Sequence, residues 1–192
     1  IVNLLEPGDV IVVAINGFFG ERMAEIADRH GADVIRINSE WGKPIDPDLV
    51  KKELSSRPKI KALGVVQAET STGSIQPLND LSKLAKEHDA LLIVDAVASL
   101  GGSPVTVEAN GIDYCFSATQ KCLGAPPGLA PVILSEQALS TIDNRKSPAR
   151  SWYFDLGLLR EYWQGGTRVY HHTAPITNNY ALWQALQLIL EE

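Results

Sequence analysis

Polar side chains capable of chemistry follow three strand-like segments of this 192-residue chain. The string Q-A-E-T-S-T-G at 67–73 follows one apolar segment, Asp95 closes a second, and S-A-T-Q-K at 117–121 follows a third. Asp95 comes directly after four consecutive aliphatic residues, so its carboxylate should lie at the partly dry edge of a sheet, where an unpaired charge is costly. We therefore expect Asp95 to have a cationic or hydrogen-bond-donating partner.

Asp95 and Lys121 each have an ordinary structural interpretation, but as a pair they indicate a cofactor. Alone, Asp95 could cap the turn S-L-G-G at 99–102, and most lysines are solvated surface groups. Together, an acid and an amine at neighbouring strand ends match the way proteins hold pyridoxal 5′-phosphate (PLP). There a lysine amine attacks the aldehyde, and an ionised carboxylate keeps the pyridine nitrogen protonated.

The composition is that of a soluble globular protein of ordinary size. The chain has 17 Lys and Arg against 23 Asp and Glu, a net charge of −6, and 45% hydrophobic residues. A mildly acidic chain has no general attraction to nucleic acid or to anionic membranes, and its apolar runs fall far short of the roughly 20 residues that span a bilayer. Two cysteines are too few for a disulfide-stapled secreted scaffold. We therefore expect an intracellular protein, cytoplasmic if microbial and peroxisomal or mitochondrial if eukaryotic.

Strand-like and helix-like segments alternate along the chain and position these polar residues. Aliphatic and β-branched runs predict strands at 10–15, 33–37, 62–66, 91–94, 114–117 and 132–134. Apolar residues at helical spacing predict helices at 21–30, 46–54, 78–88 and 135–141, and a further amphipathic helix near 188–192. The segment 91–94 is apolar on both faces, as expected of a strand in the middle of a covered sheet. The alternation predicts an α/β fold, three αβα layers around a mostly parallel central sheet.

The carboxyl ends of parallel strands are where such sheets bind ligands, because loops converge there and helix N-termini point free N–H groups inward. A dinucleotide-binding domain is the main rival at the level of the fold. However, no G-x-G-x-x-G string follows a predicted strand and no G-x-x-x-x-G-K-[ST] string occurs. The dinucleotide-binding interpretation is therefore a poor second.

Four strings in a fixed order carry a family resemblance. They are A-E-T-S-T-G at 68–73, V-D-A-V-A-S-L-G-G at 94–102, Q-K-C-L-G-A-P-P-G at 120–128 and Y-H-H-T at 170–173. With them the chain resembles the class V, fold-type I aminotransferases, and within that family the alanine:glyoxylate/serine:pyruvate group. The resemblance covers essentially the whole chain. It implies the PLP-binding large domain of these enzymes over residues 1–192.

The resemblance implies roles for residues at the predicted strand ends. Lys121 would form the internal aldimine and then act as the general base and acid that moves a proton between Cα and C4′. Asp95 would pair with the pyridinium, and Val97 would pack on one face of the ring. Thr70 would donate a hydrogen bond to the phenolic oxygen of the ring.

Other implied contacts reach the phosphate and the second ring face. Gln120 would bind the phosphate, while Tyr170 and Thr173 would reach the phosphate of the neighbouring subunit's cofactor, which implies a homodimer with shared active sites. Phe19, in N-G-F-F-G at 16–20, falls where the family stacks an aromatic ring, usually Trp. Phe has a smaller face and no N–H, so weaker stacking is expected.

The implied reaction is the transfer of an amino group from alanine or serine to glyoxylate or pyruvate. A 3-hydroxykynurenine transaminase shares most of these motifs and stays an alternative, as does an inactive scaffold that keeps the fold and the dimer surface. A cysteine desulfurase fits less well. It would need a mobile reactive Cys and typically a His on the ring, where this chain has Phe19.

Two elements of the family pattern do not occur in the sequence. A Ser-Gly phosphate loop normally lies just before the region where this chain begins, and a C-terminal small domain normally supplies the Arg that binds the substrate carboxylate. We therefore expect residues 1–192 to form a large domain that is incomplete at the N-terminus and lacks the small domain. If these residues were the entire molecule, we would expect little or no transaminase activity.

Three remaining signals have ordinary explanations. The adjacent residues His171 and His172 normally point apart, and no Cys, His or Asp cluster accompanies them, so no metal site is expected. Cys122 is expected to be a small packed residue. The aromatic residues of the C-terminal part are expected in core and subunit-interface packing rather than in base stacking. They are Trp152, Tyr153, Tyr162, Trp163 and Trp183.

Overall fold

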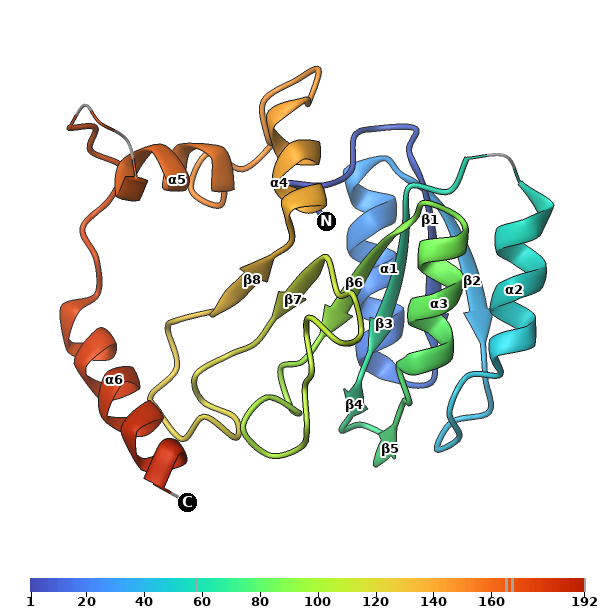
Figure 1. The fold of residues 1–192 in the computed structure, drawn as a ribbon, viewed down its shortest axis with the longest axis horizontal. Helices are drawn as coiled ribbons and strands as arrows, with labels where there is room; N and C mark the ends of the chain where they lie inside the picture. The colour runs from blue at the N-terminus through green and yellow to red at the C-terminus, as the bar shows by residue number, and fades with distance from the viewer. Residues whose placement is uncertain (58, 165, 167, 192) are drawn as a thin grey trace.

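Six strands form the central sheet of the computed structural model, which describes residues 1–57, 59–164, 166 and 168–191 (Figure 1). Their order across the sheet is β2-β1-β3-β6-β7-β8. Five of these strands, β2, β1, β3, β6 and β7, are parallel to one another, whereas β8 is antiparallel to its neighbour β7. The bounds are β1 Val10–Ile15, β2 Asp33–Asn38, β3 Ala62–Val66, β6 Leu91–Asp95, β7 Tyr114–Phe116 and β8 Val132–Leu134.

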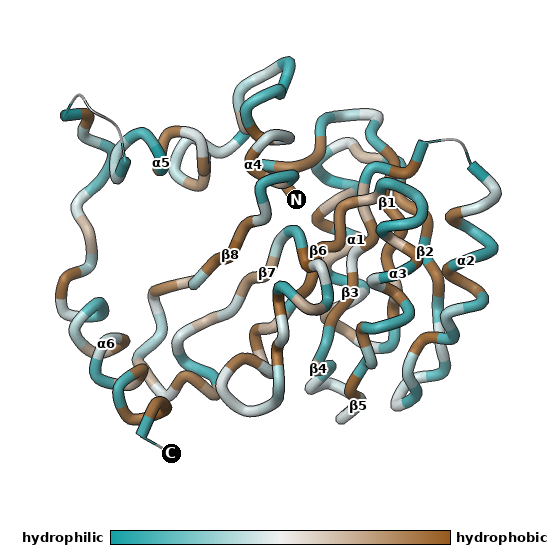
Figure 2. Tube along the Cα trace, viewed as in Figure 1, coloured by the Kyte–Doolittle hydropathy of each residue, from teal (hydrophilic) through white to brown (hydrophobic). Residues whose placement is uncertain are grey.

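Helices cover both faces of the sheet because alternate strand residues point to opposite sides. On one face, β1 residues Val12 and Ala14 pack with α2 (Pro47–Ser56) and α3 (Asn79–Glu87). On the other face, residues of β1 such as Val13 pack with α1 (Phe18–His30) and α4 (Glu136–Asp143). Figure 2 shows the hydrophobic stretches concentrated along the central strands.

The predicted α/β fold, with three layers and a mostly parallel sheet, is confirmed. The predicted strands at 10–15, 62–66 and 132–134 have the observed bounds, and the others differ by one residue at one end. The sequence analysis did not predict the two-stranded hairpin of β4 (Ala68–Glu69) and β5 (Ser74–Ile75). These two-residue strands are too short to produce a recognisable alternation of apolar and polar residues.

The helix α1 begins at Phe18, three residues before the predicted start, and ends before Gly31. Gly31 adopts a φ of 96°, in the left-handed region where glycine is favoured, and it closes the helix as predicted. At the other end, the N-cap residue Gly17 has no side chain with which to accept a hydrogen bond. The acceptor comes instead from a distant part of the chain, described with the site below.

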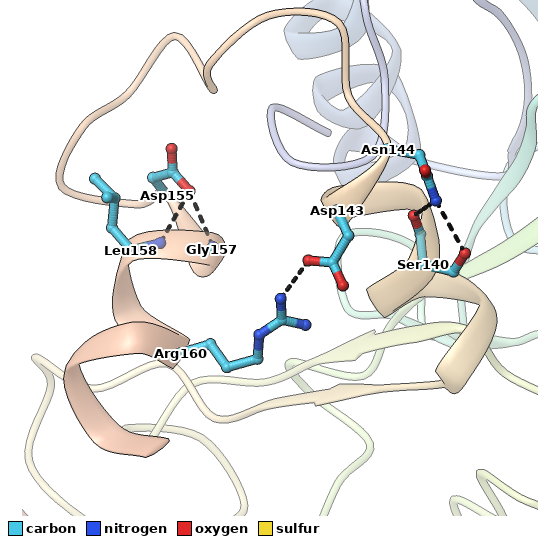
Figure 3. A network of polar contacts seen from close by, with 7 residues as sticks. All are labelled: Ser140, Asp143, Asn144, Asp155, Gly157, Leu158 and Arg160. Atoms are coloured by element: carbon cyan, nitrogen blue, oxygen red, sulfur yellow. Dashed lines mark hydrogen bonds and ion pairs between the residues drawn. The ribbon is translucent and has the colours of Figure 1, made fainter. Parts of the chain in front are cut away.

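A short polar network joins α4 to α5 (Leu156–Gln164), a helix that the sequence analysis did not predict (Figure 3). The Asp155 carboxylate caps α5 and accepts hydrogen bonds from the backbone N–H groups of Gly157 at 2.9 Å and Leu158 at 3.3 Å. Arg160 of α5 forms an ion pair with Asp143 at the end of α4. The network holds α5 beside α4.

The C-terminal helix α6 (Ile176–Glu191) contains the helical segment predicted near residue 188, and Ala185 is its only buried residue among those described. Four of the five aromatic residues expected in core or subunit-interface packing lie outside the core of this chain, since each is at least half exposed. They are Trp152, Tyr153, Trp163 and Trp183. Within the described ranges, no helix has the length and hydropathy of a membrane span.

Candidate active site

The loops that follow β1, β3, β6 and β7 all open at the carboxyl edge of the parallel strands. Figure 1 shows the β4–β5 hairpin, the first part of the loop 96–112 and the loop 117–131 together at this edge. The chain order also reverses between β1 and β3, since β2 lies on the other side of β1. Ligands of open α/β sheets bind at the carboxyl edge beside such a reversal.

Asp95 is the last residue of β6, and its half-buried carboxylate accepts a hydrogen bond from the backbone N–H of Val97 at 2.9 Å. Burial raises the pKa of Asp95 to about 6; the Val97 N–H and the charge of Arg22 act in the opposite direction, and the charge of Glu69 raises the pKa further. No ion pair to Asp95 is present among the described residues. The predicted donor is therefore a backbone amide, and a cationic partner is missing.

The alternative role for Asp95, capping the turn at 99–102, does not match the contacts of that turn. The N–H of Ser99 donates to the carbonyl of Ala96, and the N–H of Gly102 donates to the carbonyl of Ser99. The turn is thus closed by its own backbone, and the Asp95 carboxylate bonds instead to the N–H of Val97, which precedes the turn.

Lys121 lies in a turn that packs against the loop following Asp95. Its carbonyl accepts a hydrogen bond from Gly124 N at 2.9 Å, and the neighbouring Cys122 thiol donates to the carbonyl of Ala98 at 3.3 Å. A Cβ at Gly102 would lie 2.6 Å from Cys122 Sγ, so this close approach requires glycine. Cys122 is exposed, but its side chain packs against the neighbouring loop, and these contacts join the two loops.

The buried side chain of Glu69 joins the first turn of α1 to the segment that carries Thr70. Its Oε2 accepts hydrogen bonds from the backbone N–H groups of Phe19 at 2.9 Å and Gly20 at 3.2 Å. Its Oε1 accepts from the N–H of Ser71 at 3.2 Å and from its hydroxyl at 2.6 Å. Glu69 lies in the string at 68–73, but its sequence neighbours indicate no role for it, because its partner lies 50 residues earlier.

A positive charge lies over the aromatic pair at the start of α1. The guanidinium carbon of Arg22 is 5.0 Å from the ring centroids of both Phe18 and Phe19, within the range of a cation–π interaction. The two rings meet edge to face, with centroids 5.7 Å apart. The half-buried Phe19 ring therefore has a defined orientation.

The structure places Tyr170 and Thr173 in the segment between α5 and α6, beyond β8 from the Asp95 edge (Figure 1). Both are exposed, and the Tyr170 hydroxyl lies 2.7 Å from Thr173 Oγ1. No described contact joins either residue to Asp95 or to the Lys121 turn. A single chain therefore does not bring these two predicted residues to the others.

The adjacent histidines do not point apart, contrary to the prediction. Nδ1 of the buried His171 lies 2.7 Å from Nδ1 of His172, and the His171 ring stacks on Trp152 with centroids 4.3 Å apart. The described part of the chain contains no group of three or more His, Cys, Asp and Glu side chains suited to holding a metal ion.

Six of the predicted site residues thus lie in or beside the loops at one edge of the sheet. They are Phe19, Thr70, Asp95, Val97, Gln120 and Lys121. Asp95 fits a cationic ring nitrogen, since its half-buried carboxylate has a raised pKa and no ion-pair partner in the described residues. The exposed Lys121 can present an amine, and the Phe19 ring offers an apolar face. The fold matches that of the large domain of PLP-dependent aminotransferases, and these residues are ones that could hold such a cofactor.

The chain belongs to the class V aminotransferases. The pattern of the family described as Aminotransferase class-V matches residues 1–192, the whole of the sequence. The family resemblance inferred from the four strings is confirmed.

Curated relatives with similar sequences are aminotransferases by name. The chain is 41% identical over 192 residues to the alanine–glyoxylate aminotransferase of Mus musculus, covering 99% of this chain and 46% of the relative. It is 39% identical over 211 residues to the (S)-ureidoglycine–glyoxylate transaminase of Bacillus subtilis, covering 100% of this chain and 50% of the relative. The chain thus spans about half the length of the curated relatives it matches.

Solved structures agree with this assignment. The alanine–glyoxylate aminotransferase of Nostoc sp. superposes with a TM-score of 0.94 at 43% identity, over 100% of this chain and 50% of that one. The ureidoglycine–glyoxylate aminotransferase of Bacillus subtilis gives a TM-score of 0.95 at 41% identity, over 100% and 49%. A cysteine desulfurase from Thermococcus onnurineus, at 18% identity and a TM-score of 0.73, shares the fold alone.

Proposed function

We propose that the protein carrying this chain is a PLP-dependent transaminase that transfers an amino group from alanine or serine to glyoxylate or pyruvate. The observation that carries the proposal is the Asp95 carboxylate, which lies at the carboxyl edge without a cationic side-chain partner among the described residues, beside the loop that packs on the Lys121 turn. Membership of the class V aminotransferases supports the same reaction class.

Each residue at the edge has a defined task in this proposal. When bound, PLP supplies an aldehyde carbon and a ring that accepts electrons from the substrate. Lys121 Nζ would hold the cofactor and would serve as the base for the proton on the substrate Cα. Asp95 holds a proton on the ring nitrogen, because an adjacent carboxylate favours the charged ring.

The remaining residues orient the cofactor. The side chains of Phe19 and Val97 pack on the two faces of the ring, and the Thr70 hydroxyl donates to its phenolic oxygen. Gln120 binds the phosphate. The exposure of Thr70 and Gln120 at the sheet edge leaves both groups able to reach a ligand.

Glyoxylate is the better-supported amino acceptor. The mouse and Bacillus subtilis relatives are named for different amino donors and for the same acceptor, glyoxylate. The second of these names favours one further candidate function, transamination of (S)-ureidoglycine with glyoxylate. With glyoxylate as the acceptor, formation of glycine from alanine, serine or ureidoglycine in parallel assays distinguishes the donors.

The attachment site of the cofactor gives a direct test. Borohydride reduction of the PLP-loaded full-length protein, followed by peptide mass analysis, is expected to place the label on Lys121 and to find none in Lys121→Ala. Lys83, an exposed residue of α3, serves as a matched control, and Lys83→Ala should leave labelling unchanged. A label on a different lysine would contradict the assignment.

We further propose that residues 1–192 are the central, cofactor-bearing part of a two-domain subunit that functions as a homodimer. In this arrangement Tyr170 and Thr173 contact the phosphate in the partner subunit, which accounts for their distance from Asp95 within one chain. The exposed apolar residues of α6 would be covered in the assembled protein, because large apolar patches mark interaction surfaces. They include Tyr180, Trp183, Leu188 and Leu190.

A further inference from the structure

The N-terminus of α1 at the chain reversal is occupied by a side chain of the protein itself. Free N–H groups at such a position commonly bind a phosphate or another anion. Here the carboxylate of Glu69, whose side chain is 1% exposed, accepts hydrogen bonds from the N–H groups of Phe19 and Gly20. The protein therefore supplies its own anion, and a ligand phosphate would have to bind elsewhere.

The surroundings of Glu69 are shaped to hold its carboxylate. A Cβ at Gly17 would lie 2.3 Å from Glu69 Cγ and 2.7 Å from Ser71 Oγ, so the approach of the two segments requires glycine. The Ser71 hydroxyl donates to Glu69 Oε1 and accepts from the N–H of Phe18 at 2.9 Å. The hydrogen bonds from Phe19 and Gly20 to the carboxylate, and the one from Phe18 to Ser71, join the two segments. The two hydrogen bonds from Ser71 hold the carboxylate within its own segment.

These two segments each carry a residue of the proposed cofactor site. The Phe19 N–H is itself one of the donors to Glu69, and Thr70 is the next residue along the chain from Glu69. The carboxylate thus sets the position of an aromatic ring on one segment relative to a hydroxyl on the other. We propose that Glu69 is a positioning residue for the cofactor, which holds the Phe19 ring and the Thr70 hydroxyl in one fixed arrangement.

This role rests on the proposed function, and it extends to the charge of the site. The negative charge of Glu69 is among the influences that raise the pKa of Asp95, after burial, which is the largest. A neutral side chain at position 69 removes that repulsion. Asp95 then ionises at a lower pH in the cofactor-free protein, a change that a purely mechanical role for Glu69 would not produce.

The decisive experiment is a double-mutant cycle on cofactor affinity in the full-length protein. Glu69→Gln preserves the shape of the side chain but leaves one neutral acceptor oxygen in place of two charged ones, so the hydrogen bonds to the N–H groups of Phe19, Gly20 and Ser71 cannot all be kept. We expect Glu69→Gln to weaken PLP binding, followed by absorbance titration of the cofactor-free protein, by about tenfold. In a protein that already carries Phe19→Leu, Glu69→Gln should weaken PLP binding by less than about twofold, because the ring that Glu69 positions is gone.

Two further measurements separate positioning from loss of stability. The visible circular dichroism of the bound cofactor should change in Glu69→Gln, and the Phe19 and Gly20 amides should exchange at least about tenfold faster in the cofactor-free variant. The matched control Glu87→Gln alters an exposed residue at the end of α3 and should change neither signal.

The outcomes distinguish this proposal from the proposed function. The positioning role would be overturned if Glu69→Gln left PLP affinity unchanged, or if it lowered PLP affinity equally with Phe19 and with Leu at position 19. Either result would leave the transaminase assignment intact. Failure of the unchanged protein to bind PLP would overturn both. If Glu69→Gln does not fold, Ser71→Ala tests the same coupling, with an expected loss of about threefold that again shrinks in the Phe19→Leu background.

Discussion

Asp95 makes the stability of the cofactor-free protein depend on pH. Its pKa is about 6 in the folded chain, against about 3.9 in an unfolded one. Between these values the folded state keeps a proton that the unfolded state has released. The free energy of unfolding therefore falls as the pH rises from about 4 to about 6, by on the order of 2 kcal/mol from this group.

Asp95→Asn should remove the loss in the free energy of unfolding that accompanies ionisation of Asp95. At pH 8 we expect the cofactor-free variant to be more stable than the unchanged protein by on the order of 2 kcal/mol, with a smaller difference at pH 5, while cofactor affinity falls sharply. Urea unfolding at the two pH values measures the first effect, and PLP titration measures the second. An equal stability difference at both pH values would contradict the assigned pKa.

Individual residues differed in how far they could be predicted. The position of Asp95 at a sheet edge followed from four aliphatic residues before it, and the structure confirms that position. The cofactor roles of Asp95 and Lys121 stay predictions. Glu69 was quoted without a role because a buried acid and an exposed acid look alike in sequence until the tertiary partner is known.

At the scale of elements, the junction of α1 with the β4–β5 hairpin leaves no room for a side chain at position 17. Gly17→Ala should destabilise the protein by about 1–3 kcal/mol, because its Cβ would overlap Glu69. It should also weaken PLP binding by displacing the first turn of α1. Gly166→Ala is the control, since nothing lies within 4 Å of the added Cβ. Thermal unfolding that shifts equally in both variants would contradict this account.

Asp113 connects the sheet to the start of α4. Its carboxylate accepts hydrogen bonds from Leu92 N at 2.9 Å and from the Ser135 hydroxyl at 2.6 Å. Asp113→Ala leaves the buried Leu92 N–H without this acceptor, so we expect a loss of about 2–3 kcal/mol in the free energy of unfolding. Denaturant titration measures it. Asp80→Ala, at an exposed ion pair, should change stability by less than about 1 kcal/mol.

The elements with strong local patterns were predicted well, and those that depend on tertiary contacts were not. β3 has five buried residues and the predicted bounds. The start of α1 was placed three residues late because its cap is not local. The sequence pattern does not predict the helix α5. None of its described residues is fully buried, so its apolar residues do not form a clear stripe facing the core.

At the scale of the whole molecule, the separation of Tyr170 and Thr173 from Asp95 predicts complementation between subunits. A Tyr170→Phe/Thr173→Ala subunit and a Lys121→Ala subunit each lack part of every site in their own homodimers. In a dimer of the two, one site combines the intact parts and the other combines both defects. Heterodimers isolated through two different affinity tags should therefore regain about half of the normal activity per dimer.

The result that would contradict shared sites is also specific. If Tyr170 and Thr173 act within their own chain, the heterodimer gains no activity over the parent homodimers. If neither residue contacts the cofactor, the Tyr170→Phe/Thr173→Ala homodimer keeps unchanged PLP affinity. Sedimentation analysis of each variant confirms that the dimer itself is intact.

The distant cap of α1 also affects the order in which the chain acquires structure during synthesis. Phe19 leaves the ribosome well before Glu69, which lies 50 residues further along. Until β3 and β4 have emerged and the hairpin has formed, the first turn of α1 lacks its acceptor, and an isolated helix of this length is marginal in water. Ribosome-bound chains that end before Glu69 should therefore show a frayed α1, whose first turn becomes protected only when the hairpin arrives.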